Sequence, residues 1–449
     1  MLLRFRVTNH ASLRQEQELS LIAERPRDGR VERAVPRGDH QAVAVAGIFG
    51  PNASGKSNVI NAMVWMRAAV AHSFAHWAPS GGVPRRPFAL DRDAGVPSTF
   101  VVDVVIDGVA YEYGFSCDDR EFTEEWLYSY PEGRRRKLFE RTAGEPPEFG
   151  RSLTGGVRTM ARLTRPNSLF LSVAAAQNHD LLGRIHHWFD RCFRSATDHD
   201  LADRLRFTAD HYLSGAAAGE PIMQLLRYAD FGIGELMLAE AELELEAEHR
   251  LLERALRQAM GERAVRVESD PTDRVRLEHR TEEGSFVLGL AEESSGTRTW
   301  AGLLGPVFFT LAHGTLLCVD ELDARLHPNL TDALVGLFQS PDVNVNGAQL
   351  VFSTHEPALL GHNTRTELGR DQIWLTEKGA DGATALFPLS DFQVRDSSEN
   401  KEKRYLVGRY GAVPFFDERI LESIVAALRG GSGDGTTTEG AGPGREEVA

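Results

Sequence analysis

The octapeptide Gly50–Ser57, GPNASGKS, constrains this chain more than any other feature. It directly follows the apolar run 42–49 and opens a stretch with helical periodicity, which is the strand–loop–helix setting of a phosphate-binding P-loop. Glycines let such a loop close around an anion, backbone N–H groups point inward, and the following helix adds its positive end. The sequence therefore predicts that the chain binds a nucleoside triphosphate.

Individual loop residues are expected to have different roles. Lys56 should reach the β- and γ-phosphates, and Ser57 should bind Mg²⁺. The alternative is a Gly/Ser turn that matches by chance, and the flanking strand and helix argue against it. The remaining predicted nucleotide contacts in this segment are Gly50, Pro51, Asn52, Ala53, Ser54, Gly55 and Asn58.

Composition limits the class of protein. The 449 residues carry a net charge of −15, which leaves room for a local basic patch and so leaves nucleic-acid binding open. Three cysteines without paired spacing favour a reducing, cytoplasmic location. The most apolar window, 302–319, is broken by Gly305, Pro306, His313 and Gly314. It is therefore expected to form a buried helix and a buried strand, not a membrane span.

The chain is expected to alternate between strand-rich and helical regions. A helix should follow the P-loop over 56–72, helices should dominate 157–262 and end with Glu235–Met260, and βαβ alternation should resume from 303. Residues after 429 should form a disordered tail. Other strands are expected at 2–8, 16–22, 98–116 (a hairpin around Asp107-Gly108), 124–130, 137–141, 263–268, 273–280 and 285–290.

Two adjacent acids, Asp320 and Glu321, end the apolar run 315–319, which is typical of a strand buried on both faces. Neighbouring strand residues point in opposite directions, so the two carboxylates can serve two roles. We expect Asp320 to support Mg²⁺ and Glu321 to orient or deprotonate the attacking water. The alternative is a strand that merely ends in a polar loop.

His355 follows the next short apolar strand, Gln349–Ser353, and precedes a helix begun by Pro357. A single histidine is more often a structural hydrogen-bonding residue than a catalytic one. Its place one strand after the acidic pair nevertheless predicts contact with a γ-phosphate.

The segment 292–298, EESSGTR, precedes a helix expected from about residue 299. It could act only as a helix cap. The Ser295 hydroxyl and the bare Gly296 amide at a helix N-terminus would also suit an anion.

Taken in order, GPNASGKSN at 50–58, ESSGTR at 293–298, CVDELDARLHP at 318–328 and STHE at 353–356 resemble the ATP-binding-cassette type of ATPase, in its SMC/RecF/OLD-like branch. ESSGTR departs from the LSGGQ of transporters but resembles the SSGT form of OLD-like and abortive-infection ATPases. YLVGRYGAVP at 405–414 resembles the end of phage-defence ATPases encoded beside an RloB-like partner.

The resemblance implies an α/β fold: a P-loop ATPase head with a mixed parallel core sheet, an antiparallel sheet and an inserted helical lobe. It implies ATP and Mg²⁺ as cofactors, and it implies Gln177, after 168–176, as a metal-sensing glutamine at the end of a strand. The alternative for Gln177 is a helix cap or a solvent-facing residue. The expected divisions are 1–115 and 286–428 for the head, 116–285 for the hairpin and helical insertion, and 429–449 for the tail.

The same resemblance implies an ATP-driven homodimer or higher oligomer, in which Ser295 and Gly296 face the nucleotide of the other subunit. The implied function is a bacterial anti-phage, abortive-infection switch that gates an RloB-like or other effector. The alternative is a RecF-type DNA-maintenance ATPase that would use the basic clusters 134–137 and 162–165. No membrane partner is expected.

Overall fold

The structure is a computed structural model of the whole chain. Residues 1–412 form one compact unit and residues 413–449 another, and the elements below belong to the first. The predicted tail 429–449 and the predicted strand 263–268 lie outside the described residues. The structure describes residues 1–24, 30–36, 40–91, 95–197, 200–213, 219–229, 232–238, 275–290, 292–361, 364–365, 367–393, 400–414, 419, 421, 423–425 and 428.

A seven-stranded antiparallel sheet with the order β10-β9-β8-β7-β6-β1-β2 forms one layer. The predicted hairpin is present between β6 and β7, where Asp107 and Gly108 both have positive φ, as a tight two-residue turn requires. The strands are β1 (Leu2–Thr8), β2 (Gln17–Ser20), β6 (Ser98–Ile106), β7 (Val109–Cys117), β8 (Phe122–Tyr130), β9 (Arg136–Thr142) and β10 (Glu148–Phe149).

A six-stranded sheet with the order β11-β15-β16-β5-β17-β18 forms a second layer. Its first five strands are parallel and β18 runs antiparallel at the edge. Every residue of β5, β15 and β16 is buried, which explains the apolar sequences of β5 and β15 and the apolar centre of β16. The strands are β5 (Val45–Phe49), β11 (Phe193–Ala196), β15 (Leu316–Val319), β16 (Gln349–Thr354), β17 (Ile373–Lys378) and β18 (Thr384–Pro388).

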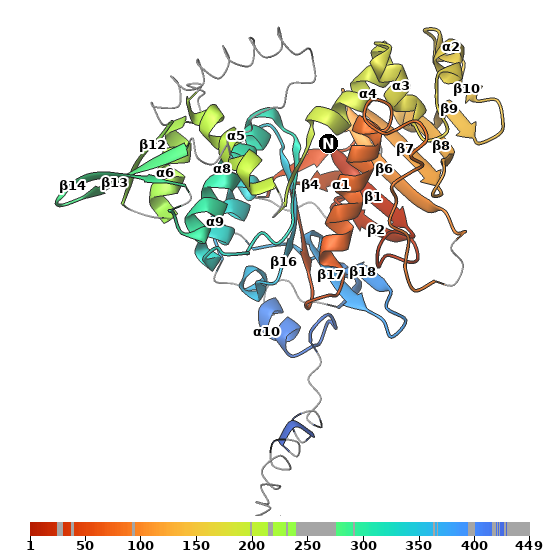
Figure 1. The fold of residues 1–449 in the computed structure, drawn as a ribbon. Coiled ribbons are helices and arrows are strands. Elements are labelled where there is room, and N and C mark those ends of the chain that lie inside the picture. Colours follow the sequence, from red (N-terminus) through yellow and green to blue (C-terminus); the bar gives the residue numbers. More distant parts are fainter. Residues whose placement is uncertain are drawn as a thin grey trace, which may run out of the picture. The chain divides into compact units, whose positions relative to one another are not determined.

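Helix α1 (Lys56–His72) follows the P-loop and can be traced in Figure 1. It contributes to a continuous hydrophobic core that also contains residues of both sheets. Its buried residues include Val59, Met63 and Met66. The predicted α/β class, with a parallel core sheet and an antiparallel sheet, is therefore confirmed. The other helices are α2 (Val157–Arg162), α3 (Phe170–Ala176), α4 (Asp180–Arg191), α5 (Leu201–Leu213), α6 (Gly219–Ala229), α8 (Ser295–His313), α9 (Pro328–Gln339) and α10 (Lys401–Leu406).

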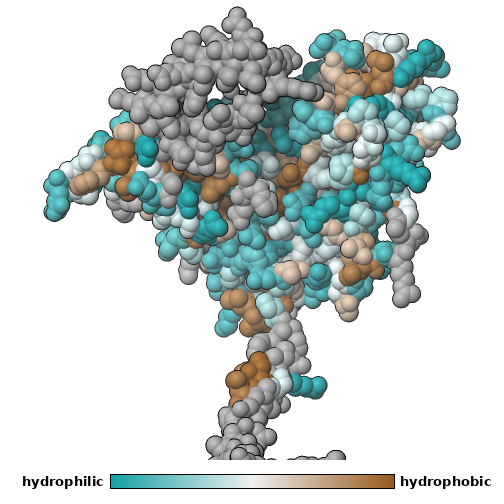
Figure 2. All heavy atoms as spheres, in the orientation of Figure 1, coloured by the Kyte–Doolittle hydropathy of each residue, from teal (hydrophilic) through white to brown (hydrophobic). Residues whose placement is uncertain are grey.

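A three-stranded sheet is formed by β12 (Ile233–Leu238), β13 (Val275–Thr281) and β14 (Gly284–Gly289). The predicted helix Glu235–Met260 is wrong at its start, because Glu235–Leu238 pair with β13. Burial of Ile233 and Leu236 in this sheet outweighs the helix propensity of the Glu/Leu run. Figure 2 shows hydrophobic surface along the β13–β14 hairpin behind a hydrophilic tip.

The expected insertion, 116–285, shares both main sheets with the head. Strands β8, β9 and β10 extend the antiparallel sheet, and β11 pairs with β15 of the parallel sheet. Short strands β3 (Glu32–Ala34) and β4 (Gln41–Val43) form a separate pair. Among the described residues, no helix is long and apolar enough to cross a membrane, and 302–319 forms the end of α8 followed by β15.

Candidate functional site

Parallel strands bring the predicted motifs to one edge of the six-stranded sheet. Strands β15, β16 and β5 are direct neighbours, so their carboxyl ends lie side by side. The acidic pair follows β15, His355 follows β16 and the P-loop follows β5. Ligands of open parallel sheets bind at this kind of edge.

A cavity of about 700 Å³ opens at that edge. Its lining combines P-loop residues with residues from the ends of three other strands. Sequence reasoning did not single out Lys378, which ends β17. The lining residues are Asn52, Ala53, Gly55, Lys56, Ser57, Asn58, Glu321, His355 and Lys378.

The P-loop is held by the neighbouring β17–β18 hairpin. Ser54 Oγ lies 2.6 Å from Thr376 Oγ1, and Thr384 Oγ1 donates to the Ser54 carbonyl at 2.7 Å. A Cβ atom at Gly50 would lie 2.4 Å from Thr376 Oγ1, and one at Gly55, where φ is +107°, would lie 2.2 Å from Thr384 Oγ1. Both glycines are therefore required by close packing, and Gly55 also by its backbone conformation.

Lys56 is 4% exposed, and its ammonium group lies at the centre of the site. Nζ donates to the carbonyls of Gly50 at 2.8 Å and Pro51 at 3.0 Å, and lies 3.1 Å from His355 Nδ1. Burial lowers the pKa of Lys56 to about 8, although nearby carboxylates, Asp323 first among them, oppose this effect. A buried ammonium group that bonds to neutral partners is suited to an incoming anion.

The two adjacent acids are fixed by one hydroxyl from β16. Ser353 Oγ donates to Asp320 Oδ1 at 2.5 Å and accepts a bond from the Glu321 backbone N at 2.8 Å. Glu321 has a φ of 51°, and its side chain is 44% exposed, with Oε1 4.0 Å from His355 Nε2. Asp320 thus bonds toward β16, whereas Glu321 lines the cavity.

His355 is anchored through its backbone. Its N–H donates to both oxygens of Asp323, at 3.1 and 3.2 Å. Its ring therefore lies between Lys56 on one side and Glu321 on the other. Asp323 was not predicted as a site residue, although it stands within the DELDARLHP segment that carries the family resemblance.

The residues present fit a nucleotide with Mg²⁺. The glycine-dependent loop and the Lys56 ammonium suit phosphates, and Ser57 and Asp320 carry hard oxygen atoms of the kind that would hold Mg²⁺. Among the described residues, no group of three or more His, Cys, Asp or Glu side chains could hold a metal by itself. This agrees with Mg²⁺ sites that rely on substrate phosphates for several ligands.

Ser295 and Gly296 do not line this cavity in the same chain. They begin α8, whose N-cap Ser294 accepts a bond from the Thr297 backbone N at 3.0 Å. A Cβ atom at Gly296 would lie 2.9 Å from the Arg325 carbonyl oxygen, so α8 starts against the loop that follows the acidic pair. Their contact with the nucleotide of another subunit stays a prediction.

The prediction that Gln177 ends a strand near the metal is wrong about the strand. Residues 170–176 form α3, and exposed Gln177 caps its C-terminus, as in the alternative considered above. The helix forms because buried Glu125 accepts bonds from the first N–H groups, those of Phe170 and Leu171. Its side chains pack inward against the far end of α1.

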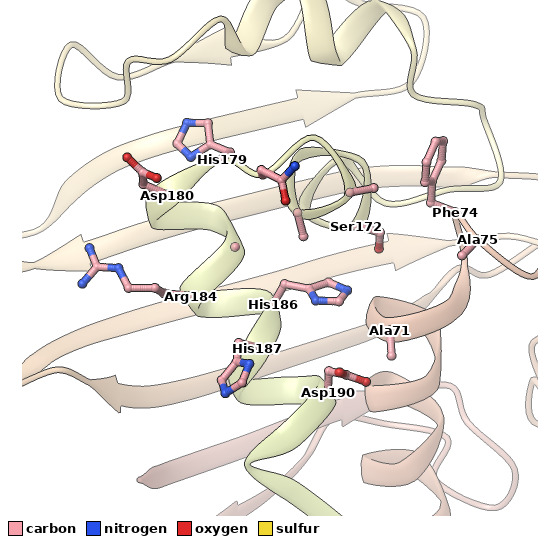
Figure 3. Close-up of a pocket in the computed structure, with 14 residues that line it drawn as sticks. Ala71, Phe74, Ala75, Ser172, His179, Asp180, Arg184, His186, His187 and Asp190 are labelled. Carbon is pink, nitrogen blue, oxygen red and sulfur yellow. The ribbon is translucent and has the colours of Figure 1, made fainter.

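The position of α3 also separates Gln177 from the P-loop. Ser172 Oγ donates to the Val70 carbonyl at 2.6 Å, and Val70 lies roughly 21 Å along α1 from Lys56 at 1.5 Å per residue. A second cavity of about 570 Å³ opens here, between the end of α1, α3 and α4 (Figure 3). His186 and Asp190 of α4 face it, and Gln177 is not part of its lining.

Three residues of the basic clusters that a DNA-binding alternative would use have partners within the chain. The Arg135 guanidinium lies 3.7 Å from the centre of the Tyr128 ring, and Lys137 pairs with Glu140 at 3.1 Å. Arg165 donates to the backbone carbonyl of Ser73 at 2.9 Å. Arg135, Lys137 and Arg165 therefore each have a structural role that needs no nucleic acid.

Comparison with known proteins gives the family. Residues 45–361, from the P-loop strand to just beyond His355, match the family described as "AAA domain, putative AbiEii toxin, Type IV TA system". The chain belongs to this AAA-domain family. The match covers the P-loop, the acidic pair and His355 together, and of the residues that line the cavity only Lys378 lies outside the matched segment.

This AAA-domain protein was also compared with curated proteins and with solved structures. No curated protein matches the chain. Among solved structures, an SmcHead bound to the C-winged helix domain of ScpA is similar at 12% identity, with a TM-score of 0.42 and coverage of 86% of this chain and 97% of that one. An Smc head domain with an extended coiled coil, bound to the C-terminal domain of ScpA derived from Pyrococcus furiosus, is similar at 12% identity. Its TM-score is 0.39, and the match covers 94% of this chain and 99% of that one.

Proposed function

We propose that this chain binds ATP with Mg²⁺ and hydrolyses it. The convergence of Lys56, Glu321 and His355 around one cavity carries the proposal. Lys56 would offset phosphate charge, and the exposed Glu321 carboxylate would accept a proton from the attacking water. Ser57 and Asp320 would hold Mg²⁺, and the ion would supply positive charge that offsets the charge of the phosphates. His355 would contact the terminal phosphate.

The proposed output is a switch in bacterial anti-phage defence. The family description names a putative AbiEii toxin and a toxin–antitoxin system, and the segment 405–414 resembles the end of ATPases encoded beside an RloB-like partner. In this proposal, the ATP-bound and ATP-free states of a homodimer gate an effector protein in the cytoplasm.

Replacing Glu321 by Gln tests the catalytic proposal. The amide keeps the shape of the side chain but cannot accept a proton, so we expect ATP affinity within about twofold of wild type and turnover lowered by roughly 10²- to 10⁴-fold. Equilibrium binding and phosphate release measure the two quantities. In cells, the variant should also lose protection against phage.

Glu283→Gln provides the matched control, because Glu283 is exposed in the turn between β13 and β14. It should bind and hydrolyse ATP like the wild type. Full turnover by Glu321→Gln would remove Glu321 as the base, and absence of ATP hydrolysis by the wild type would remove the proposed function.

A further inference from the structure

Lys378 gives the nucleotide cavity a second ammonium group. It is the last residue of β17, the parallel neighbour of the P-loop strand, and Leu375 pairs with Phe49 in that ladder. The strand therefore continues past the point where β5 turns into the loop. Lys378 is exposed and lines the cavity together with P-loop residues, Lys56 among them.

Strand alternation fixes the direction in which Lys378 projects. Residues two apart on a strand share a face, so Lys378 lies on the same face as Thr376, whose hydroxyl bonds to Ser54 and approaches Gly50. Glu377 lies on the opposite face, where its carboxylate approaches Gly411. Lys378 is thus directed at the P-loop by the same geometry that makes Thr376 hold it.

The pairing of β17 with β18 stabilises this position from the other side. Lys378 pairs with Thr384, whose hydroxyl donates to the Ser54 carbonyl at 2.7 Å. Both residues that flank the base of Lys378 in the hairpin, Thr376 and Thr384, are therefore bonded to Ser54 of the P-loop. The lysine side chain extends from a backbone that is rigidly connected to the phosphate-binding loop.

Charge in the cavity favours a second cation. Glu321 lines the cavity, and Asp320 and Asp323 lie close enough to Lys56 to affect its pKa. A triphosphate would add several negative charges to this site. Lys56, bonded to Gly50 and Pro51 at the start of the loop, marks the end that receives the β- and γ-phosphates. Lys378 lines the same cavity as Lys56, Glu321 and His355.

We propose that Lys378 binds the terminal phosphate of the nucleotide and sets the preference of the site for a nucleoside triphosphate over a diphosphate. The inference rests on the proposed function. Lysine suits this role because its compact ammonium group acts as a mobile point charge for phosphate oxygens.

The test compares ATP and ADP binding to the full chain carrying Lys378→Gln. We expect ATP affinity to fall roughly tenfold, the size of one hydrogen bond to a charged group. ADP affinity should change less than about threefold, because the contacted phosphate is missing. Lys378→Arg, which keeps the charge, should retain most of the ATP preference. Lys403→Gln, which removes an exposed charge from α10, is the matched control and should bind both nucleotides like wild type.

The outcomes separate this inference from the proposed function. If wild type binds ATP and Lys378→Gln binds it equally well, the inference is overturned while the proposed function stands. Equal loss of ATP and ADP affinity would also overturn it, because the contact would then lie with groups that both nucleotides share. Failure of wild type to bind ATP would overturn both. An unchanged unfolding temperature in Lys378→Gln would show that the folded cavity was tested.

Discussion

The P-loop region around Lys56 has its partner residues within its own chain, whereas the signature region, residues 293–298 at the start of α8, does not contact the cavity of that chain. Around Lys56, the ends of β15 and β16 supply Glu321 and His355, and the β17–β18 hairpin holds the loop. Around Ser295, the start of α8 lies against the Arg325 carbonyl of its own chain and does not reach the cavity. In the proposed function, one chain would therefore bind ATP by itself, whereas hydrolysis would require a second chain.

Replacing Lys56 by Ala should have the largest effect on the P-loop region. Without the ammonium group, phosphate charge is not offset in the bound state or the transition state, so hydrolysis should fall at least about hundredfold. ATP binding should also be lost. Equilibrium binding and phosphate release provide the measurements, and wild-type values for both would show that the cavity is not a P-loop site.

Ser295→Arg tests the signature region. If this region acts only on the nucleotide of another subunit, the variant should bind ATP like wild type but hydrolyse it at least about tenfold more slowly, because a bulky side chain prevents closure of the pair. Full turnover by Ser295→Arg would contradict the comparison.

Mixing Ser295→Arg with Lys56→Ala sharpens the same comparison. In a mixed dimer, one composite site carries both lesions and the other carries neither, so random exchange should restore up to about a quarter of the activity if the sites act independently. Phosphate release by the mixture, compared with each variant alone, measures this recovery.

The smallest expected effect concerns the packing beneath the P-loop region. His10 is 1% exposed and lies near the rings of Trp65 in α1 and Phe100 in β6. Burial, aided by Arg86, lowers the pKa of His10 to about 4. In the unfolded chain, His10 therefore binds a proton near pH 6.5, whereas in the folded chain it stays neutral until about pH 4. The free energy of unfolding is therefore lowered as the pH falls from about 6.5 to 4.

Between pH 7.5 and pH 5, this residue should lower the free energy of unfolding by up to about 2 kcal/mol. His10→Phe keeps an aromatic ring without the titrating group, so its stability should fall less over the same pH range. Urea unfolding at the two pH values is the measurement. An equal loss in the variant and the wild type would assign the acid sensitivity to other groups.

The sequence predicted those site residues that lie in short motifs directly after an apolar run. Asp320, Glu321 and His355 follow apolar runs, and parallel strands that end together bring such residues to one edge. Thr376, Thr384 and Lys378 were missed because they act on a loop more than 300 residues earlier in the chain and belong to no recognisable motif.

The expectations of a strand before Gln177 and of a helix from Glu235 were wrong for the same physical reason. In both cases, contacts with residues distant in the sequence determine the secondary structure more strongly than the local pattern does. The apolar run before Gln177 resembles a strand, but the carboxylate of Glu125, from a distant strand, caps it as a helix. The Glu/Leu run at 235–238 favours a helix by propensity, yet it pairs with β13. Neither partner could be identified from local sequence.

Gly411 packs against Glu377 of β17, the strand that also contacts the P-loop. A Cβ atom there would lie 3.0 Å from Glu377 Oε2, and its φ of +66° would also strain any larger residue. One face of β17 therefore touches the phosphate-binding loop, while its other face touches the segment that leads, two residues later, into the C-terminal unit. Adjacent residues of one strand, Thr376 and Glu377, thus serve opposite sides of the fold, so any shift of β17 would be felt both by the P-loop and by the turn at Gly411.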